Sequence, residues 1–136
     1  MKKKQFKIGK RELVISEAIF KRKVNVLLNF TPADFEKWCK KKGDKEYKDD
    51  GKERDFTAFS CDLSGKDKPT EWIICMKHFD WTIKDQGTLI HEIVHTVVKI
   101  FQCNNIPFNN DTQEFLAHNI GNIYEDICRK ILNKKT

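Results

Sequence analysis

Residues 87–101 read GTLIHEIVHTVVKIF and contain the run HEIVH at positions 91–95. The apolar residues of this stretch recur at helical spacing, which predicts a helix. On a helix, His91 and His95 project from the same face one turn apart, which is the geometry that two ligands of one zinc ion need. Glu92 stands beside the first histidine and can reach a water molecule bound to such an ion. The stretch therefore predicts a zinc site of the hydrolytic kind.

At about 100° per residue, this helix has a broad apolar side and a separate polar flank. His91 and His95 lie together on the flank, and Glu92 lies further round. The alternative is a core helix whose histidines make ordinary hydrogen bonds. We favour the metal site, because three polar residues on such a helix would cost burial energy without a partner. The side predicted to be buried carries Ile90, Ile93, Val94, Val97, Val98, Ile100 and Phe101.

The chain of 136 residues predicts one domain, residues 1–136, with a single modest core. Apolar residues make up 39% and charged residues 34%, which is typical of a globular protein with a charged surface. No apolar run approaches the roughly 20 residues that a membrane span needs. The first seven residues, MKKKQFK, lead into no apolar stretch that could serve as a signal peptide. We therefore predict a cytoplasmic protein without a membrane partner.

The five cysteines are odd in number, widely spaced and without a C-x-x-C pair. Their spacing predicts reduced thiols and indicates neither a disulfide framework nor a cysteine zinc cluster. The formal net charge of +6 permits a nucleic-acid partner. Its lysines and arginines are dispersed, however, and no aromatic residues interleave with them, so solvated charged faces are the favoured interpretation. The oligomeric state is not indicated by the sequence.

The N-terminal part predicts strands and one helix. Residues 4–15 alternate loosely and fit either a short strand pair or a strand followed by a helix. Residues 23–30 alternate with a period of two, which predicts a strand with one buried face. Residues 32–42 form a helix with both ends marked, by Thr31 as the N-cap and by three lysines before a glycine. Residues 44–55 are almost entirely charged and predict an exposed loop.

The C-terminal part predicts a hairpin and two helices. Two β-rich runs, 56–63 and 71–77, flank a loop with glycine and proline. The second run is apolar on both sides, as a strand covered by helices would be. Asp85 is the predicted N-cap of the helix with the two histidines. After a loop rich in asparagine, a second helix opens at residues 111–114 and extends to about 132.

A catalytic zinc takes three protein ligands and leaves one position for water. Glu114 ranks first as the third ligand, because an antiparallel pairing of the two helices could bring it back toward the metal. Small residues at 117 and 121 would let the helices approach closely. Alternatively, Glu114 caps its own helix. The remaining ligand candidates, with His118 the nearest rival, are His78, Asp111 and His118.

Further side chains could support the site without holding the metal. A histidine or tyrosine near a metal can orient a ligand or donate a hydrogen bond to a developing oxyanion. His118, if it is not a ligand, Tyr124 and His78 are candidates for these roles. Each could equally be a structural residue.

Residues 88–95 (TLIHEIVH), followed by residues 112–117 (TQEFLA), resemble the gluzincin branch of the zincin metallopeptidases. The order of strand, helix, hairpin and metal helix is similar to compact zincin-like proteins encoded by bacteriophages and to the metallopeptidase module of the ImmA/IrrE regulators. The resemblance implies a zinc site with His91, His95 and Glu114 as ligands. It implies Glu92 as the general base.

We therefore expect a small zincin-like α+β domain with a mixed or antiparallel sheet, a packed helix, the metal helix and a C-terminal helix. By resemblance, an extended peptide substrate would pair with an exposed edge strand at residues 71–77. No large second subdomain is present to enclose a deep cleft, which predicts a zinc peptidase with a narrow substrate range. The alternatives are a non-catalytic, zinc-stabilised interaction protein and a DNA-associated protease.

Overall fold

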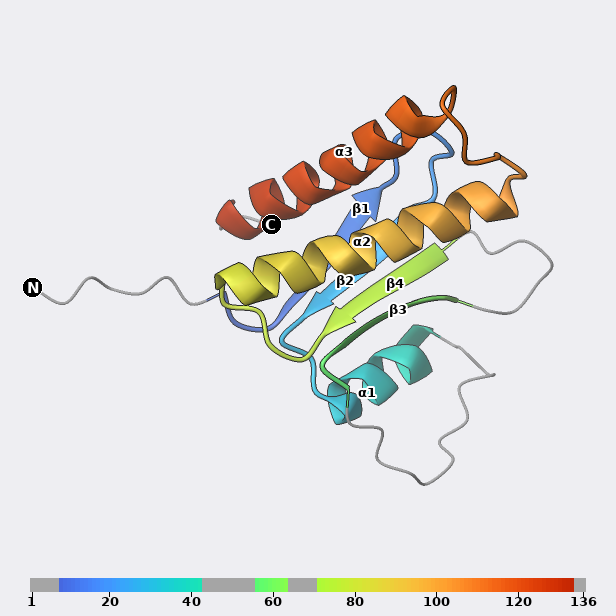
Figure 1. The fold of residues 1–136 in the computed structure, drawn as a ribbon. Helices are drawn as coiled ribbons and strands as arrows, with labels where there is room; N and C mark the ends of the chain where they lie inside the picture. The colour runs from blue at the N-terminus through green and yellow to red at the C-terminus, as the bar shows by residue number, and fades with distance from the viewer. Residues whose placement is uncertain (1–7, 43–55, 64–70, 134–136) are drawn as a thin grey trace, which may run out of the picture.

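A computed structural model of the chain describes residues 8–42, 56–63 and 71–133 (Figure 1). The predicted loops at 44–55 and 64–69, like the lysines near the start of the chain, lie outside the described residues. Within the described ranges no helix has the length and apolar character needed to cross a bilayer. The elements are β1 (Arg11–Ser16), β2 (Lys23–Leu28), α1 (Pro32–Lys42), β3 (Ala58–Asp62), β4 (Glu71–Met76), α2 (Ile83–Cys103) and α3 (Gln113–Leu132).

The four strands form one mixed sheet in the order β1-β2-β4-β3. β1 pairs with β2, and β3 with β4, in antiparallel fashion, whereas β2 and β4 are parallel. This arrangement confirms the α+β class, the mixed sheet and the predicted hairpin pairing. The expectation that residues 71–77 form an edge strand is wrong, because β4 hydrogen-bonds to a strand on each side. The edge next to β4 is β3.

Helices cover both faces of the sheet, with α1 on one face and with α2 and α3 on the other (Figure 1). Successive residues of a strand point to opposite faces, so Ile74 of β4 packs in the α2/α3 layer and Ile73 packs against α1. β2 was expected to bury only one face. Both its faces are buried, including Asn25 and Leu27 at 0% exposure, since α1 covers the second face.

A buried carboxylate ties the β1-β2 turn to α3. Glu17 is fully buried, and its side chain accepts hydrogen bonds from the backbone N–H groups of Ile19 and Phe20 and, at 2.9 Å, from the Asn119 amide of α3. After β1 the chain therefore turns directly back into β2, rather than continuing into the helix that was one of two alternatives. Nothing in the local sequence pattern pointed to this role of Glu17.

The start of α2 is fixed by a network centred on Asn29, just after β2. Its side chain accepts a hydrogen bond from the Phe79 backbone N–H at 2.8 Å and donates to the carbonyl oxygens of Gly9 (2.6 Å) and Phe79 (3.2 Å). Asn29 has a φ of 62°, in the left-handed region that asparagine tolerates better than most residues. The segment between β4 and α2 is thereby held against the end of β2.

α2 begins earlier than the sequence suggested, and its N-cap is not Asp85. Thr82 is the N-cap, because its hydroxyl accepts a hydrogen bond from the Asp85 backbone N–H at 3.1 Å. The Asp85 carboxylate instead accepts from the Asp80 backbone N–H at 2.8 Å. Two residues assigned to the buried side are also exposed, Ile90 by 41% and Val94 by 36%.

α3 begins at Gln113 with Thr112 as its N-cap residue, without a hydrogen bond from the Thr112 side chain to the helix end. The predicted close approach through Ala117 and Gly121 is wrong. Both are exposed, and a Cβ added at Gly121 would meet nothing within 4 Å. The side chains of α3 that pack against the main core are larger: Leu116, Ile120, Ile123, Tyr124, Ile127 and Ile131.

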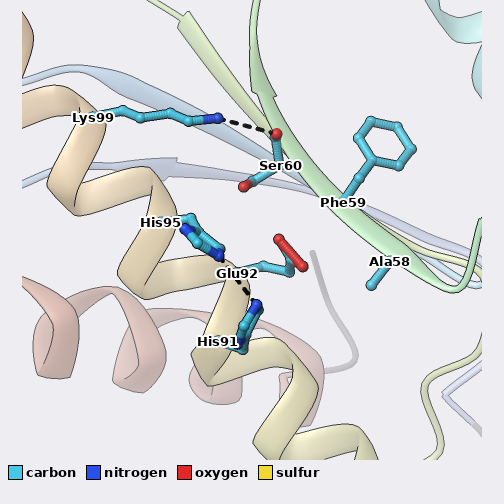
Figure 2. Close-up of a pocket in the computed structure, with 7 residues that line it drawn as sticks. All are labelled: Ala58, Phe59, Ser60, His91, Glu92, His95 and Lys99. Carbon is cyan, nitrogen blue, oxygen red and sulfur yellow. Dashed lines mark hydrogen bonds between the residues drawn. The ribbon is translucent and has the colours of Figure 1, made fainter.

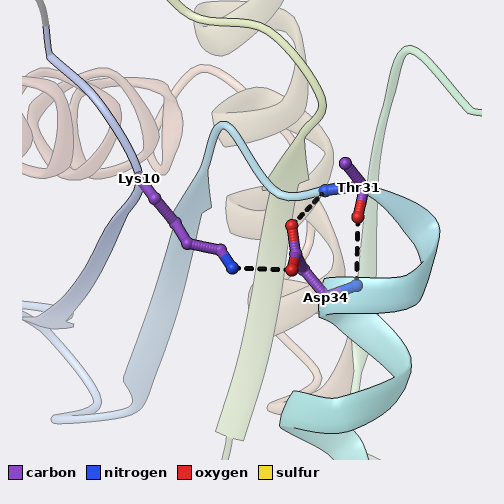
Figure 3. Close-up of polar contacts among 3 residues, drawn as sticks. All are labelled: Lys10, Thr31 and Asp34. Carbon is purple, nitrogen blue, oxygen red and sulfur yellow. Dashed lines mark hydrogen bonds and ion pairs between the residues drawn. The ribbon is translucent and has the colours of Figure 1, made fainter.

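α1 has the predicted bounds, and its first turn is a capping box (Figure 3). The Thr31 hydroxyl accepts from the Asp34 N–H at 3.1 Å, and the Asp34 carboxylate accepts from the Thr31 N–H at 3.0 Å. The Lys10 ammonium lies 2.6 Å from the other Asp34 oxygen. The hydrogen bond from Lys10, together with that from the Thr31 backbone, lowers the pKa of Asp34 from its ordinary 3.8 to about 2.

We predict that Asp34→Ala lowers the free energy of unfolding at pH 7 by about 1 kcal/mol, because the Thr31 N–H and the Lys10 ammonium lose their acceptor while the Thr31 cap itself remains. The folded-state pKa of Asp34 is depressed, so its contribution is complete above pH 3.8 and is lost as the pH falls through about 2. Chemical denaturation across this range measures the effect. Glu36→Ala, which removes only the exposed pair with Lys40 on the same helix, should cost less than about 0.5 kcal/mol. Equal losses for both variants would contradict the assignment.

Candidate active site

The two histidines of α2 converge on one point, as the sequence predicted. The Nε2 atoms of His91 and His95 lie 3.1 Å apart, and their rings are nearly perpendicular at 80°. Two imidazole nitrogens that bind one tetrahedral zinc at about 2.0–2.1 Å lie about 3.3 Å from each other. The observed separation is close to this value. Both side chains are exposed, so the nitrogens are accessible from solvent.

Glu92 lies in the same pocket, and little of the residue is exposed. The residue is 7% exposed, and within the described ranges its carboxylate makes neither a hydrogen bond nor an ion pair. Only its backbone carbonyl is engaged, accepting from the Thr96 hydroxyl at 2.9 Å. Among the described residues, its carboxylate oxygens do not belong to the buried side-chain atoms that lack a partner, so they reach solvent through the pocket.

The pocket lies between α2 and the edge strand β3 and has a volume of about 400 Å³. Figure 2 shows the side chains of His91, Glu92 and His95 extending from α2 toward β3. Among residues 8–42, 56–63 and 71–133, β3 is the last strand of the sheet on this side, so no described strand covers the flank of α2 above that edge. Its lining consists of Ala58, Phe59 and Ser60 from β3, and of His91, Glu92, His95 and Lys99 from α2.

The free edge of β3 offers backbone groups to this pocket. The pairs Thr57–Lys77 and Leu63–Glu71, in the β3-β4 register, are hydrogen-bonded. Because bonded and non-bonded pairs alternate along an antiparallel ladder, the N–H and C=O groups of Ala58, Ser60 and Asp62 point away from β4. Unpaired strand-edge groups of this kind can accept an extended peptide as an additional strand.

The structure does not bring Glu114 into a group with the histidines. The Glu114 side chain is 81% exposed, and its carboxylate lies 3.6 Å from Nε2 of His118, which is 76% exposed. Across the described ranges, no three His, Cys, Asp or Glu side chains are placed to hold one metal ion. Gln86 faces α3, where it accepts from the Tyr124 hydroxyl, and His95 lies about 180° around the helix from it. α3 therefore packs on the flank of α2 opposite the histidines.

The other suggested supporting residues also lie outside the pocket lining. The Tyr124 hydroxyl donates to Oε1 of Gln86 at 3.1 Å, and desolvation in this helix contact raises the pKa of the phenol. Tyr124 thereby joins α3 to α2. His78 is exposed in the segment between β4 and α2. Neither residue lies where it could orient a metal ligand or donate to an oxyanion in the described pocket, so the roles proposed for them as supporting residues gain no support.

Four lining residues were not anticipated, and two of them, Lys99 and Ser60, have polar side chains. Lys99 follows His95 by four residues and Glu92 by seven, so helical spacing alone places it on the same face. That signal was available in the sequence. The sequence carried no comparable sign that Ser60 lines the pocket, because that depends on the order of the strands in the sheet.

A comparison of the chain with known protein families, characterised proteins and solved structures finds no match. The fold and site by themselves define an α+β chain in which a His-Glu-x-x-His helix lies above an open sheet edge.

We predict different effects for two glutamates of low exposure in the metal-free protein. Glu92→Gln changes a carboxylate that makes no hydrogen bond or ion pair among the described residues and that reaches solvent, so it should change the free energy of unfolding by less than about 0.5 kcal/mol. Glu17→Gln replaces a carboxylate that accepts hydrogen bonds from several N–H donors. It should lower the free energy of unfolding by about 2 kcal/mol. Urea denaturation at pH 7 with a chelator present measures both. A loss of stability in Glu92→Gln would mean that the carboxylate has a stabilising partner.

Proposed function

We propose that the chain is a zinc-dependent peptidase of zincin type, with a narrow substrate range. The observation that carries the proposal is the convergence of the His91 and His95 Nε2 atoms at 3.1 Å in the pocket that also holds the carboxylate of Glu92. The outward edge of β3 forms the other side of this pocket. A metal-binding pair, a base and a peptide-binding edge are the parts that hydrolysis of a peptide bond needs.

His91 and His95 would hold the metal through Nε2. A bound zinc ion would lower the pKa of its water toward neutrality and polarise the scissile carbonyl. Glu92 takes a proton from the attacking water on a carboxylate oxygen and then delivers it to the nitrogen of the leaving amine. The water oxygen becomes bonded to the carbonyl carbon as the C–N bond breaks, which yields a carboxylate and an amine. The position of Glu92 in the same pocket as His91 and His95 supports this role.

Glu114 remains the predicted third ligand, with His118 as its rival. Both side chains are largely exposed, so turning them costs little packing. The first turn of α3 would nevertheless have to move toward the histidine flank of α2. Water molecules completing the coordination of a two-histidine site are the alternative, and metal analysis of variants distinguishes the two.

The peptide would bind along β3 rather than along residues 71–77. The outward groups of Ala58 and Ser60 would pair with an extended segment, as in other cases of strand addition. The pocket of about 400 Å³ opens widely to solvent, so an extended segment can continue beyond it. The narrow substrate range and the expected cytoplasmic location stay predictions.

We predict about one zinc per wild-type chain by elemental analysis after loading and dialysis. His95→Ala should lose most of it, whereas His78→Ala, which removes an exposed histidine outside the pocket, should retain it. Loss of zinc in Glu114→Ala would establish the third ligand, and its retention there with loss in His118→Ala would assign His118. A wild-type chain that cannot be loaded with zinc would contradict the proposal.

We predict that Glu92→Gln retains zinc but loses peptide cleavage by at least about 100-fold, because the general base is gone. Glu125→Gln, on the exposed side of α3, should cleave normally. Cleavage is measured on a peptide mixture by mass spectrometry, with and without chelator. A zinc-loaded wild type that cleaves nothing would favour the non-catalytic interaction protein, and salt-dependent DNA binding would favour the DNA-associated protease.

A further inference from the structure

The pocket has one feature that the proposed chemistry does not use, the side chain of Lys99. It stands one turn after His95, lines the pocket and is partly buried. Its ammonium donates to the backbone carbonyl oxygen of Ser60 at 3.5 Å (Figure 2). Within the described ranges Lys99 makes no ion pair, although the Glu92 carboxylate lines the same pocket. The ammonium therefore has only a weak, neutral partner.

The contact between Lys99 and Ser60 involves a backbone group that a bound peptide would also use. The Ser60 carbonyl points away from β4, toward the free edge. A peptide that adds to this edge places its own N–H groups opposite such carbonyls. The peptide N–H and the Lys99 ammonium therefore compete for the Ser60 carbonyl. Peptide binding is more favourable when the peptide itself offers the displaced ammonium a better acceptor. A carboxylate is that acceptor, because charge-assisted hydrogen bonds are about twice as strong as neutral ones.

We propose that Lys99 is a specificity-determining residue that selects peptides carrying a carboxylate beside the cleaved bond. The inference rests on the proposed function, because it assumes a peptide on β3. No other cation lines the described pocket. Lys99 lies between the histidines and the C-terminal end of α2. The carboxylate that it binds would therefore lie beside His91 and His95, toward the C-terminal end of α2.

The direction of β3 and the orientation of the peptide together specify which side of the cleaved bond lies near Lys99. From Ala58 to Ser60, β3 passes from the His91 end of the pocket to the Lys99 end (Figure 2). A peptide antiparallel to β3 runs the other way, so its residues on the N-terminal side of the cleaved bond lie near Lys99. The selected group is then an aspartate or glutamate side chain on that side. A peptide parallel to β3 would instead bring its C-terminal carboxylate to Lys99.

Binding and cleavage of matched peptides test this inference. Peptides that differ only in glutamate or glutamine N-terminal to the bond, or in a free or amidated C-terminus, are titrated by fluorescence anisotropy against the Glu92→Gln protein. The glutamate peptide should bind about tenfold more tightly than its glutamine twin. In the Glu92→Gln protein, a second change of Lys99→Met should make the two affinities equal, whereas Lys99→Arg should keep most of the difference. Lys37→Met, a matched change on α1, should leave the difference unchanged. Thermal unfolding checks that the Lys99→Met protein remains folded.

The outcomes separate this inference from the proposed function. If wild type cleaves peptides in a zinc-dependent and Glu92-dependent manner without preferring glutamate, or if Lys99→Met keeps the preference, the role of Lys99 is wrong and the peptidase stands. If nothing is cleaved, the peptidase fails, and the binding ratio still decides whether Lys99 selects carboxylates. Preference for the free C-terminus alone would overturn the side-chain assignment. Absence of binding by any peptide would overturn the inference.

Discussion

Every feature of the candidate site depends on the packing of one face of α2 against the sheet. Leu89, Ile93, Val97 and Ile100 are fully buried in the main core. Burial of each such side chain contributes on the order of 1.5–3 kcal/mol, so rotation of the helix about its axis is strongly disfavoured. With 3.6 residues per turn, the flank that carries the histidines is then directed to the open side of β3. The apolar residues thus orient the polar ones.

Burial fixes the rotation of α2, and polar contacts at its N-terminus fix its position along the axis. A shift by one residue moves a helix by about 1.5 Å and turns it by about 100°, which would separate the histidines from Ser60 and Ala58. The hydrogen bonds between Asn29 and Phe79 and the cap at Thr82 prevent such a shift. The residues that position the site therefore include ones at the far end of β2.

Sequence reasoning succeeded where the determinants are local. Both ends of α1 were predicted, because the capping residues and the terminal lysines lie within the helix and beside it. The convergence of His91 and His95 followed from helical spacing alone. The strand that forms the edge was assigned wrongly, because the assignment relied on resemblance. The apolar character of β4 on both sides already indicated an interior strand.

Long-range determinants could not be read from local patterns. The side of α2 on which α3 packs depends on the core contacts of both helices with the sheet, and the spacing of Glu114 from His95 says nothing about it. Glu17 was missed for a similar reason, since its hydrogen-bonding partners include an amide 102 residues away. The strand order that exposes β3 likewise follows from pairings between distant segments.

The open edge of β3 has a consequence for the protein in a crowded solution. An unpaired strand edge is a template on which a second copy of the same chain can add its own strand, which leads to aggregation. β3 has only five residues, ends in the charged Asp62 and has Lys99 on the outward carbonyl of Ser60. Short length and charge are the means by which natural sheets prevent such pairing. A neutral residue at position 99 would therefore leave the chain more prone to self-association.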